Sequence, residues 1–225
     1  MHKLVDTKQE TSTLTRAFPE DVKYQEVCKR YAFVRHVRGD GNCFYRALCF
    51  GLLESLLRDD RGMQSLKEKL IRSGRELLTA GFDERAFTDL LSIFINVLER
   101  SEAEDHEDVL LQLFNDQLIS DSMVQYLRLL TSAYLQNHAD FFQNFLEAPN
   151  LKVYCTQEVE TMATECDHVE ILALAEALDV GICIVSMEGR DGQLSCHILP
   201  EGTEPSLHLL YKTSHYDILY LTAQH

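Results

Sequence analysis

The sequence predicts a single α+β domain with a large helical lobe and a small C-terminal β-sheet. Two observations carry this prediction: no proline occurs between Cys43 and Ala148, and short β-rich runs separated by turn residues follow Pro149. No repeat, low-complexity tract or linker divides the 225 residues, of which 45% are hydrophobic. A chain of this length and composition can bury a core without disulfides or metals.

The first part of the chain divides into an arm, a helix, a strand and a turn. Residues 1–18 mix Thr, Ser and charges without periodicity, which predicts a flexible N-terminal arm ahead of a domain over 19–225. A helix from Pro19 to Tyr31, a strand over 32–37 and a glycine-rich turn over 38–42 follow.

Successive helices are predicted for the middle of the chain and strands for its end. The helices span about 43–58, 63–79, 83–99, 106–114 and 117–146. The segment Cys43–Leu57 is apolar nearly all round, which is typical of a central buried helix. Asp167 or a neighbour caps a helix that runs to about Leu178, and strands follow at 180–187, 193–199, 207–211 and 216–221.

Charge and hydropathy exclude two classes of partner. The chain has 21 Lys and Arg against 36 Asp and Glu, a net charge of −15, and no basic cluster, so we expect no nucleic acid. The longest near-continuous apolar run, Leu90–Leu98, is about half the roughly 20 residues of a membrane span, so we expect no membrane insertion. The N-terminus lacks a signal-peptide pattern, and the seven cysteines are odd in number. We therefore expect reduced thiols and a location in the cytoplasm or nucleus.

The turn before the first central helix carries a candidate nucleophile. Its sequence is GDGNCF at 39–44, in which Gly39 and Gly41 allow positive φ and Asp40 can satisfy local amides. Such a turn points N–H groups into one concavity, which suits an oxyanion. Cys43 begins the helix, where the macrodipole favours a thiolate. Taken alone, the segment is equally consistent with a structural turn followed by a buried cysteine.

A candidate base lies near the C-terminus. In the run SHYDILY at 214–220, His215 and Asp217 are two residues apart, so on a strand both side chains point to the same face. A carboxylate beside an imidazole holds its tautomer and stabilises the imidazolium. Such pairs also occur in sheets by chance, so the combination with Cys43 carries the argument.

Together these segments resemble the OTU (ovarian tumour) family of cysteine deubiquitinases, and its otubain branch in particular. The segments that carry the resemblance are GDGNCF at 39–44, RALCFGLLESLL at 46–57, VQYLRLLTSAYLQNHADFF at 124–142, EVETMATECDHVEILALAEAL at 158–178 and LLYKTSHYDILY at 209–220. The resemblance runs from about residue 20 to the C-terminus and implies a papain-like α+β fold.

The resemblance also implies an activity and its residues. A family member cleaves the isopeptide bond after the C-terminal Gly-Gly of ubiquitin, with ubiquitin, polyubiquitin chains and ubiquitin-conjugating enzymes as partners and with no metal or cofactor. Cys43 matches the nucleophile, His215 the general base and Asp217 the third triad member. The backbone N–H of Asp40 matches an oxyanion-hole donor, together with the N–H of Cys43 and of Gly41.

Three further residues match a segment that contacts substrate in the family, namely Glu165, Asp167 and His168. This stretch lacks the aromatic and glycine residues that many OTU enzymes place there, and Asp167 has the simpler interpretation of a helix cap. Two other functions use the same chain: a non-catalytic binder that holds ubiquitin or a conjugating enzyme and blocks transfer, and a peptidase for a ubiquitin-like modifier.

Overall fold

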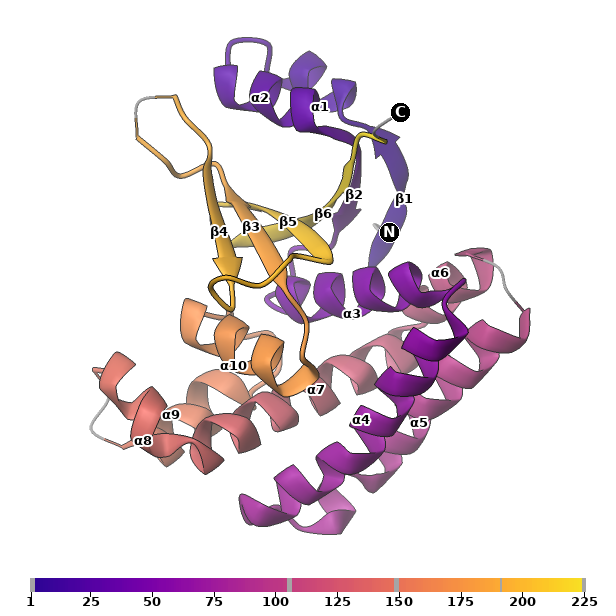
Figure 1. Cartoon of the computed structure of the whole chain (residues 1–225), viewed down its shortest axis with the longest axis vertical. Helices are drawn as coiled ribbons and strands as arrows, with labels where there is room; N and C mark the ends of the chain where they lie inside the picture. Colours follow the sequence, from indigo (N-terminus) through magenta and orange to yellow (C-terminus); the bar gives the residue numbers. More distant parts are fainter. Residues whose placement is uncertain (1–2, 105–106, 148–149, 191, 224–225) are drawn as a thin grey trace.

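The computed structural model describes residues 3–104, 107–147, 150–190 and 192–223. Within these residues the strands form one mixed sheet of six, in the order β1-β2-β6-β5-β3-β4 (Figure 1). The strands are β1 Val5–Glu10, β2 Tyr31–Val37, β3 Ile182–Ser186, β4 Ser195–Leu199, β5 Leu207–Lys212 and β6 His215–Leu221. Neighbouring strands are antiparallel except for the parallel pair β3 and β5.

The pairing of β2 with β6 is the contact that positions the site. Arg35 pairs with Ile218 and Val34 with Leu219, so the end of β2 lies beside the start of β6. The chain leaves β2 directly into the turn at 38–42, while β6 begins with His215. Segments that are far apart in the sequence therefore meet at one end of the sheet.

Helices cover both faces of the sheet and extend away from one of them (Figure 1). Their bounds are α1 Ser12–Ala17, α2 Val22–Arg30, α3 Cys43–Leu56, α4 Asp60–Thr79, α5 Glu84–Glu104, α6 Glu107–Asn115, α7 Gln117–Asn137, α8 Ala139–Phe142, α9 Leu151–Tyr154 and α10 His168–Leu178. A 3-10 turn at Gln143–Phe145 and a π-helical turn at Cys155–Val159 complete the list. Helices α1 and α2 lie over one face, and α3 with the long helices α4, α5 and α7 lies on the other.

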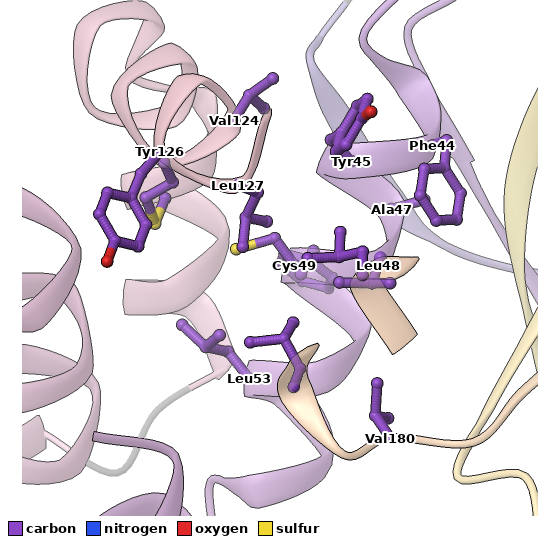
Figure 2. Packing of buried hydrophobic residues seen from close by; sticks show 14 of the residues in the cluster. Phe44, Tyr45, Ala47, Leu48, Cys49, Leu53, Val124, Tyr126, Leu127 and Val180 are labelled. Atoms are coloured by element: carbon purple, nitrogen blue, oxygen red, sulfur yellow. The ribbon is translucent and has the colours of Figure 1, made fainter. Parts of the chain in front are cut away.

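Helix α3 is the centre of the helical lobe, as its apolar composition predicted. Ten of its fourteen residues are buried. Figure 2 shows the side chains of Tyr45 and Cys49 on α3 near those of Val124 and Leu127 on α7. Because the first residue of this buried helix is Cys43, the position of the candidate nucleophile is set by the packing of the main core.

The α+β fold class is confirmed, with one correction at the N-terminus. The prediction of a flexible arm over 1–18 is wrong for residues 5–17, which form β1 and α1 and belong to the domain. Strand β1 pairs with β2, the Val5 side chain is fully buried, and the Thr11 hydroxyl donates to the carbonyl of Tyr31 at 2.7 Å. The main-chain ladder holds this edge strand while most of its side chains face solvent, so no hydrophobic alternation marks it in the sequence.

The remaining elements differ from prediction mainly in their ends. The predicted helix over 117–146 ends at Asn137, and α5 continues to Glu104 instead of stopping near residue 99. The four C-terminal strands are found, but the sheet also takes in the N-terminal β1 and β2. No helix within the described ranges is both long and apolar enough to cross a membrane.

Candidate active site

The turn between β2 and α3 has a backbone shape that requires glycine. Gly41 has φ +82°, and a Cβ built on it would lie 2.0 Å from the carbonyl oxygen of Ala163. Ala163 is itself in the left-handed region, with φ +64°. The turn at Gly41 and the segment around Ala163 are therefore in direct backbone contact. Cys43 follows the turn as the first residue of α3 and is only 4% exposed.

The side chain of Asp40 stabilises this turn from within. One carboxylate oxygen, Oδ1, accepts from the N–H of Asn42 at 2.9 Å, and the other, Oδ2, accepts from Arg46 at 3.2 Å. Arg46 is fully buried on α3 and also donates to Asp121 at 2.8 Å and to the hydroxyl of Ser120. Asp40 therefore shapes the turn through its carboxylate, and α3 and α7 both hold it through Arg46.

Some backbone N–H groups of the turn donate hydrogen bonds within the protein, and others do not. The N–H of Asp40, an oxyanion-hole donor in the resemblance, donates to the carbonyl of Arg38 at 3.1 Å in this structure. In the part of the chain that the structure describes, the N–H groups of Gly41 and Cys43 donate to no protein acceptor. They remain as donors at the positive end of the α3 dipole, where an anion is favoured.

The side chains of His215 and Asp217 meet, as their spacing on a strand predicted. The Nε2 atom of His215 lies 2.9 Å from Oδ1 of Asp217. His215 also interacts with the side chain of Cys43, and the interactions with Asp217 and Cys43 raise the pKa of His215 to about 10. A Cβ at Gly39 would lie 3.3 Å from Nδ1 of His215, so this glycine gives the ring room beside the turn.

Asp217 is held by more partners than the sequence indicated. Its Oδ1 also accepts from the N–H of Val37 at 2.8 Å, and its Oδ2 accepts from Nδ1 of His36 at 3.0 Å. Burial disfavours the carboxylate, but the hydrogen bonds from His215 and His36 outweigh it and hold the pKa of Asp217 below its usual range. The contact with Asp217 likewise raises the pKa of His36.

A buried cysteine, with an imidazole beside it that is hydrogen-bonded to a carboxylate, is the arrangement of a cysteine peptidase. Comparison with known proteins identifies which one. The family model for peptidase C65, otubain, matches residues 1–221. The chain belongs to the otubain family.

Named otubains match almost the whole chain. Human ubiquitin thioesterase OTUB2 is 44% identical over 227 residues, which cover 99% of this chain and 97% of that protein. Human ubiquitin thioesterase OTUB1 is 43% identical over 224 residues, 96% of this chain and 83% of that protein. The fold is also that of a solved otubain: ceOTUB1, in a complex with ubiquitin aldehyde and UBC13~Ub, superposes with a TM-score of 0.92 at 29% identity, covering 99% of this chain and 95% of that chain.

In this otubain the predicted substrate residues lie on the surface at the N-terminal end of α10, with Glu165 before the helix and His168 as its first residue. Asp167 is the N-cap of α10: its side chain accepts from the N–H of His168 at 2.7 Å and forms a capping box with Glu170. The interpretation of Asp167 as a helix cap is therefore confirmed. Glu165 and His168 are exposed, and His168 lies edge-on to His197 of β4, with the ring centroids 6.4 Å apart.

Sequence reasoning missed three residues that surround the site in this otubain. His36, Arg46 and Arg128 all contact a site residue or its turn through hydrogen bonds, and those of His36 and Arg128 join residues far apart in the sequence. Only the β2–β6 register could have indicated His36, since it places residue 36 beside residue 217. Among the described residues no group of three or more His, Cys, Asp or Glu is arranged to hold a metal ion.

Proposed function

We propose that this chain is a deubiquitinating cysteine peptidase that hydrolyses the bond after the C-terminal Gly-Gly of ubiquitin. One observation carries the proposal: His215 is hydrogen-bonded to Asp217 and interacts with Cys43, which lies at the N-terminus of the central helix. The relatives named ubiquitin thioesterase, 44% and 43% identical over almost the full chain, support ubiquitin as the substrate.

The arrangement supports a two-step acyl transfer. The Cys43 thiolate attacks the carbonyl carbon of the terminal glycine, and the N–H groups of Gly41 and Cys43 stabilise the tetrahedral oxyanion. His215 gives its proton to the departing lysine amine, which leaves the acyl group on sulfur as a thioester. His215 then takes a proton from water, which attacks the thioester, releases the ubiquitin carboxylate and restores the thiolate.

Asp217, the third member of the proposed triad, determines the charge state of the pair formed by Cys43 and His215. Asp217 stabilises the imidazolium form of His215, so the ion pair of thiolate and imidazolium is favoured over the neutral pair. Since the pKa of His215 lies near 10, the ring is protonated at neutral pH and can act as the acid for the first step.

The partners follow from the same site. We propose ubiquitin and polyubiquitin chains, recognised through the ubiquitin tail, with Glu165 and His168 as contacts on the surface at the N-terminal end of α10. The solved relatives hold ubiquitin aldehyde together with UBC13~Ub or UBCH5B~Ub, which makes ubiquitin-conjugating enzymes a second class of partner to test. All seven cysteines are free thiols, which supports the reducing cytoplasm or nucleus as the compartment.

The experiment is a labelling reaction with ubiquitin that carries a thiol-reactive electrophile at its C-terminus. Purified protein is expected to gain the mass of one ubiquitin, and Cys43→Ala is expected to gain none. A folded wild-type protein that forms no adduct but binds ubiquitin would overturn the peptidase and favour the non-catalytic binder. An adduct only with the tail of another modifier would favour a peptidase for a ubiquitin-like protein.

A further inference from the structure

A buried arginine outside the proposed triad contacts the nucleophile turn. Arg128 lies on α7, and its side chain is fully buried. One terminal nitrogen donates to the carbonyl of Val159 at 3.1 Å. The other donates to the carbonyl of Gly41 at 3.0 Å, to Oδ1 of Asn42 at 2.8 Å and to the carbonyl of Thr164 at 2.8 Å. A single guanidinium thus joins the turn to the segment 159–164.

The partners of Arg128 differ in kind from those of the other buried arginines. Each of its four acceptors is a neutral carbonyl or amide oxygen, and no salt bridge joins it to a carboxylate in the described part of the chain. Arg35 and Arg46 are equally buried but are each paired with two carboxylates. A buried cation without an anionic partner is costly, and burial lowers the pKa of Arg128. We infer that its placement serves the turn.

The two segments joined by Arg128 also contact each other directly. The side-chain oxygen of Asn42 that accepts from Arg128 accepts in addition from the N–H of Ala163 at 2.9 Å. Asn42 precedes α3 but does not cap it, because its side chain is committed to these two contacts instead. Gly41 also approaches the carbonyl of Ala163 closely. We call this set of contacts between the turn and residues 159–164 the joint; apart from Arg128, it consists of backbone and amide groups.

The joint fixes the orientation of one peptide unit next to the nucleophile. Arg128 holds the carbonyl oxygen of the Gly41–Asn42 peptide, and the carboxylate of Asp40 holds its N–H at 2.9 Å. Because a peptide unit is planar, anchoring both its oxygen and its hydrogen prevents it from rotating. The amides on either side, those of Gly41 and Cys43, then keep their directions. Rotation of this peptide would misalign the donors that face the reacting carbonyl.

We propose that Arg128 is a positioning residue of the catalytic site, which acts through Gly41 and Asn42 to keep the oxyanion-hole amides in place. The proposal rests on the hydrolase function proposed above, since it concerns the tetrahedral intermediate of that reaction. It requires that loss of Arg128 lower the rate of acyl transfer more than the reactivity of the Cys43 thiolate, since alkylation of a thiolate passes through no oxyanion.

The test compares two reactions of one variant, Arg128→Lys. Lysine keeps the positive charge but offers a point donor in place of the planar fork, so it can satisfy fewer of the four acceptors. We expect kcat for hydrolysis of a fluorogenic C-terminal ubiquitin amide to fall about 10- to 100-fold, with KM within about threefold. The rate of iodoacetamide alkylation at Cys43, followed by peptide mass spectrometry, is expected to stay within about twofold.

Two further variants separate positioning from stability. Arg35→Lys changes an arginine that is equally buried but bonded to Glu54 and Glu107, so it is expected to lower the melting temperature and leave kcat within about twofold. Asn42→Ala removes a shared acceptor while leaving three others for Arg128, and it is expected to lower kcat selectively, by a smaller factor than Arg128→Lys. If Arg128→Lys does not fold, the Asn42→Ala result decides.

The outcomes distinguish this proposal from the proposed function. A wild-type protein that alkylates at Cys43 but hydrolyses no ubiquitin substrate would overturn both. An active wild type whose Arg128→Lys variant hydrolyses at the wild-type rate, or loses hydrolysis and alkylation in parallel, would overturn the positioning role alone.

Discussion

The two halves of the proposed catalytic site are held in different ways. The nucleophile half, around Cys43, is anchored from inside by the buried arginines Arg46 and Arg128. The base half sits at the sheet surface, where the side chain of His215 is 31% exposed. It follows a two-residue hairpin in which Thr213 and Ser214 both have positive φ. The core therefore fixes where the nucleophile lies, while the buried carboxylate of Asp217 determines how the base titrates.

This difference has a physical reason. An oxyanion hole works only if its donors are already oriented, so a rigid buried frame suits the nucleophile half. A base must change its charge during each turnover, so partial contact with solvent and a tunable carboxylate suit the other half. Four predictions test the comparison, from the largest expected effect to the smallest.

Removing the nucleophile breaks the first half completely. We expect Cys43→Ala to abolish turnover, with a loss of about 10⁶-fold in kcat, because the thioester can no longer form. Hydrolysis of a fluorogenic ubiquitin substrate measures the loss. The exposed thiol of Cys196 provides the control, since Cys196→Ser is expected to keep wild-type activity. Turnover by Cys43→Ala at the wild-type rate would contradict the whole scheme.

Removing the carboxylate disables the second half in a pH-dependent way. The hydrogen bond to Asp217 is the largest contribution that raises the pKa of His215, so Asp217→Ala returns that pKa toward its ordinary value of about 6.5. The imidazolium is then lost as the pH rises through neutrality instead of near pH 10. We expect a weak residual activity, lower by about 10²- to 10⁴-fold at pH 8, and an alkaline limb of kcat/KM displaced to lower pH.

The pH profile of Asp217→Asn serves as the companion measurement. Asparagine preserves the shape but not the charge, so its alkaline limb is expected to lie close to that of Asp217→Ala. An alkaline limb at the same pH in wild type and both variants would show that Asp217 does not control His215.

A charge outside both halves tests whether substrate binding is separate from chemistry. Glu165 is exposed before α10, on a chain of net charge −15, and the arginines of the ubiquitin tail are attracted to negative charge. Glu165→Lys is expected to raise KM several-fold, on the order of 1 kcal/mol of binding free energy, with kcat unchanged. An unchanged KM at low ionic strength would remove Glu165 from the substrate contacts.

The smallest effect is expected at the hairpin before His215. Thr213 has φ +51° and Ser214 has φ +59°, a shape that the Asn-Gly pair adopts with less strain. The double substitution Thr213→Asn, Ser214→Gly is expected to stabilise the fold by about 1 kcal/mol, seen as a rise of roughly 2–4 °C in melting temperature. Activity within about twofold of wild type would indicate that this hairpin turn only connects β5 and β6. A fall in stability would show that these side chains hold the turn.

Local sequence patterns predict those parts of the site whose structure depends on residues close together in the sequence. The glycine-rich turn ahead of an apolar helix made Cys43 a candidate nucleophile, and the two-residue spacing predicted that His215 and Asp217 share one face. Asp167 was predicted as a cap and is one. The N-terminal segment was mispredicted because its structure depends on residues far away in the sequence. Residues 5–10 form a strand through hydrogen bonds to β2, and their own sequence has no alternation of apolar and polar residues that predicts a strand.

The sequence by itself determined the fold class, the central buried helix, the chemistry of the three proposed triad residues and the order in which they occur. The fold class and the buried helix follow from periodicity and turn propensity, which are local properties, whereas the roles of Cys43, His215 and Asp217 were implied by the resemblance to the OTU family. Only the tertiary structure decided that His36 shares the Asp217 carboxylate, that the Asp40 N–H is engaged, and that Arg128 joins the turn to 159–164. Such contacts arise where separately formed elements pack together, and a buried polar group takes whatever partner the packing brings within reach.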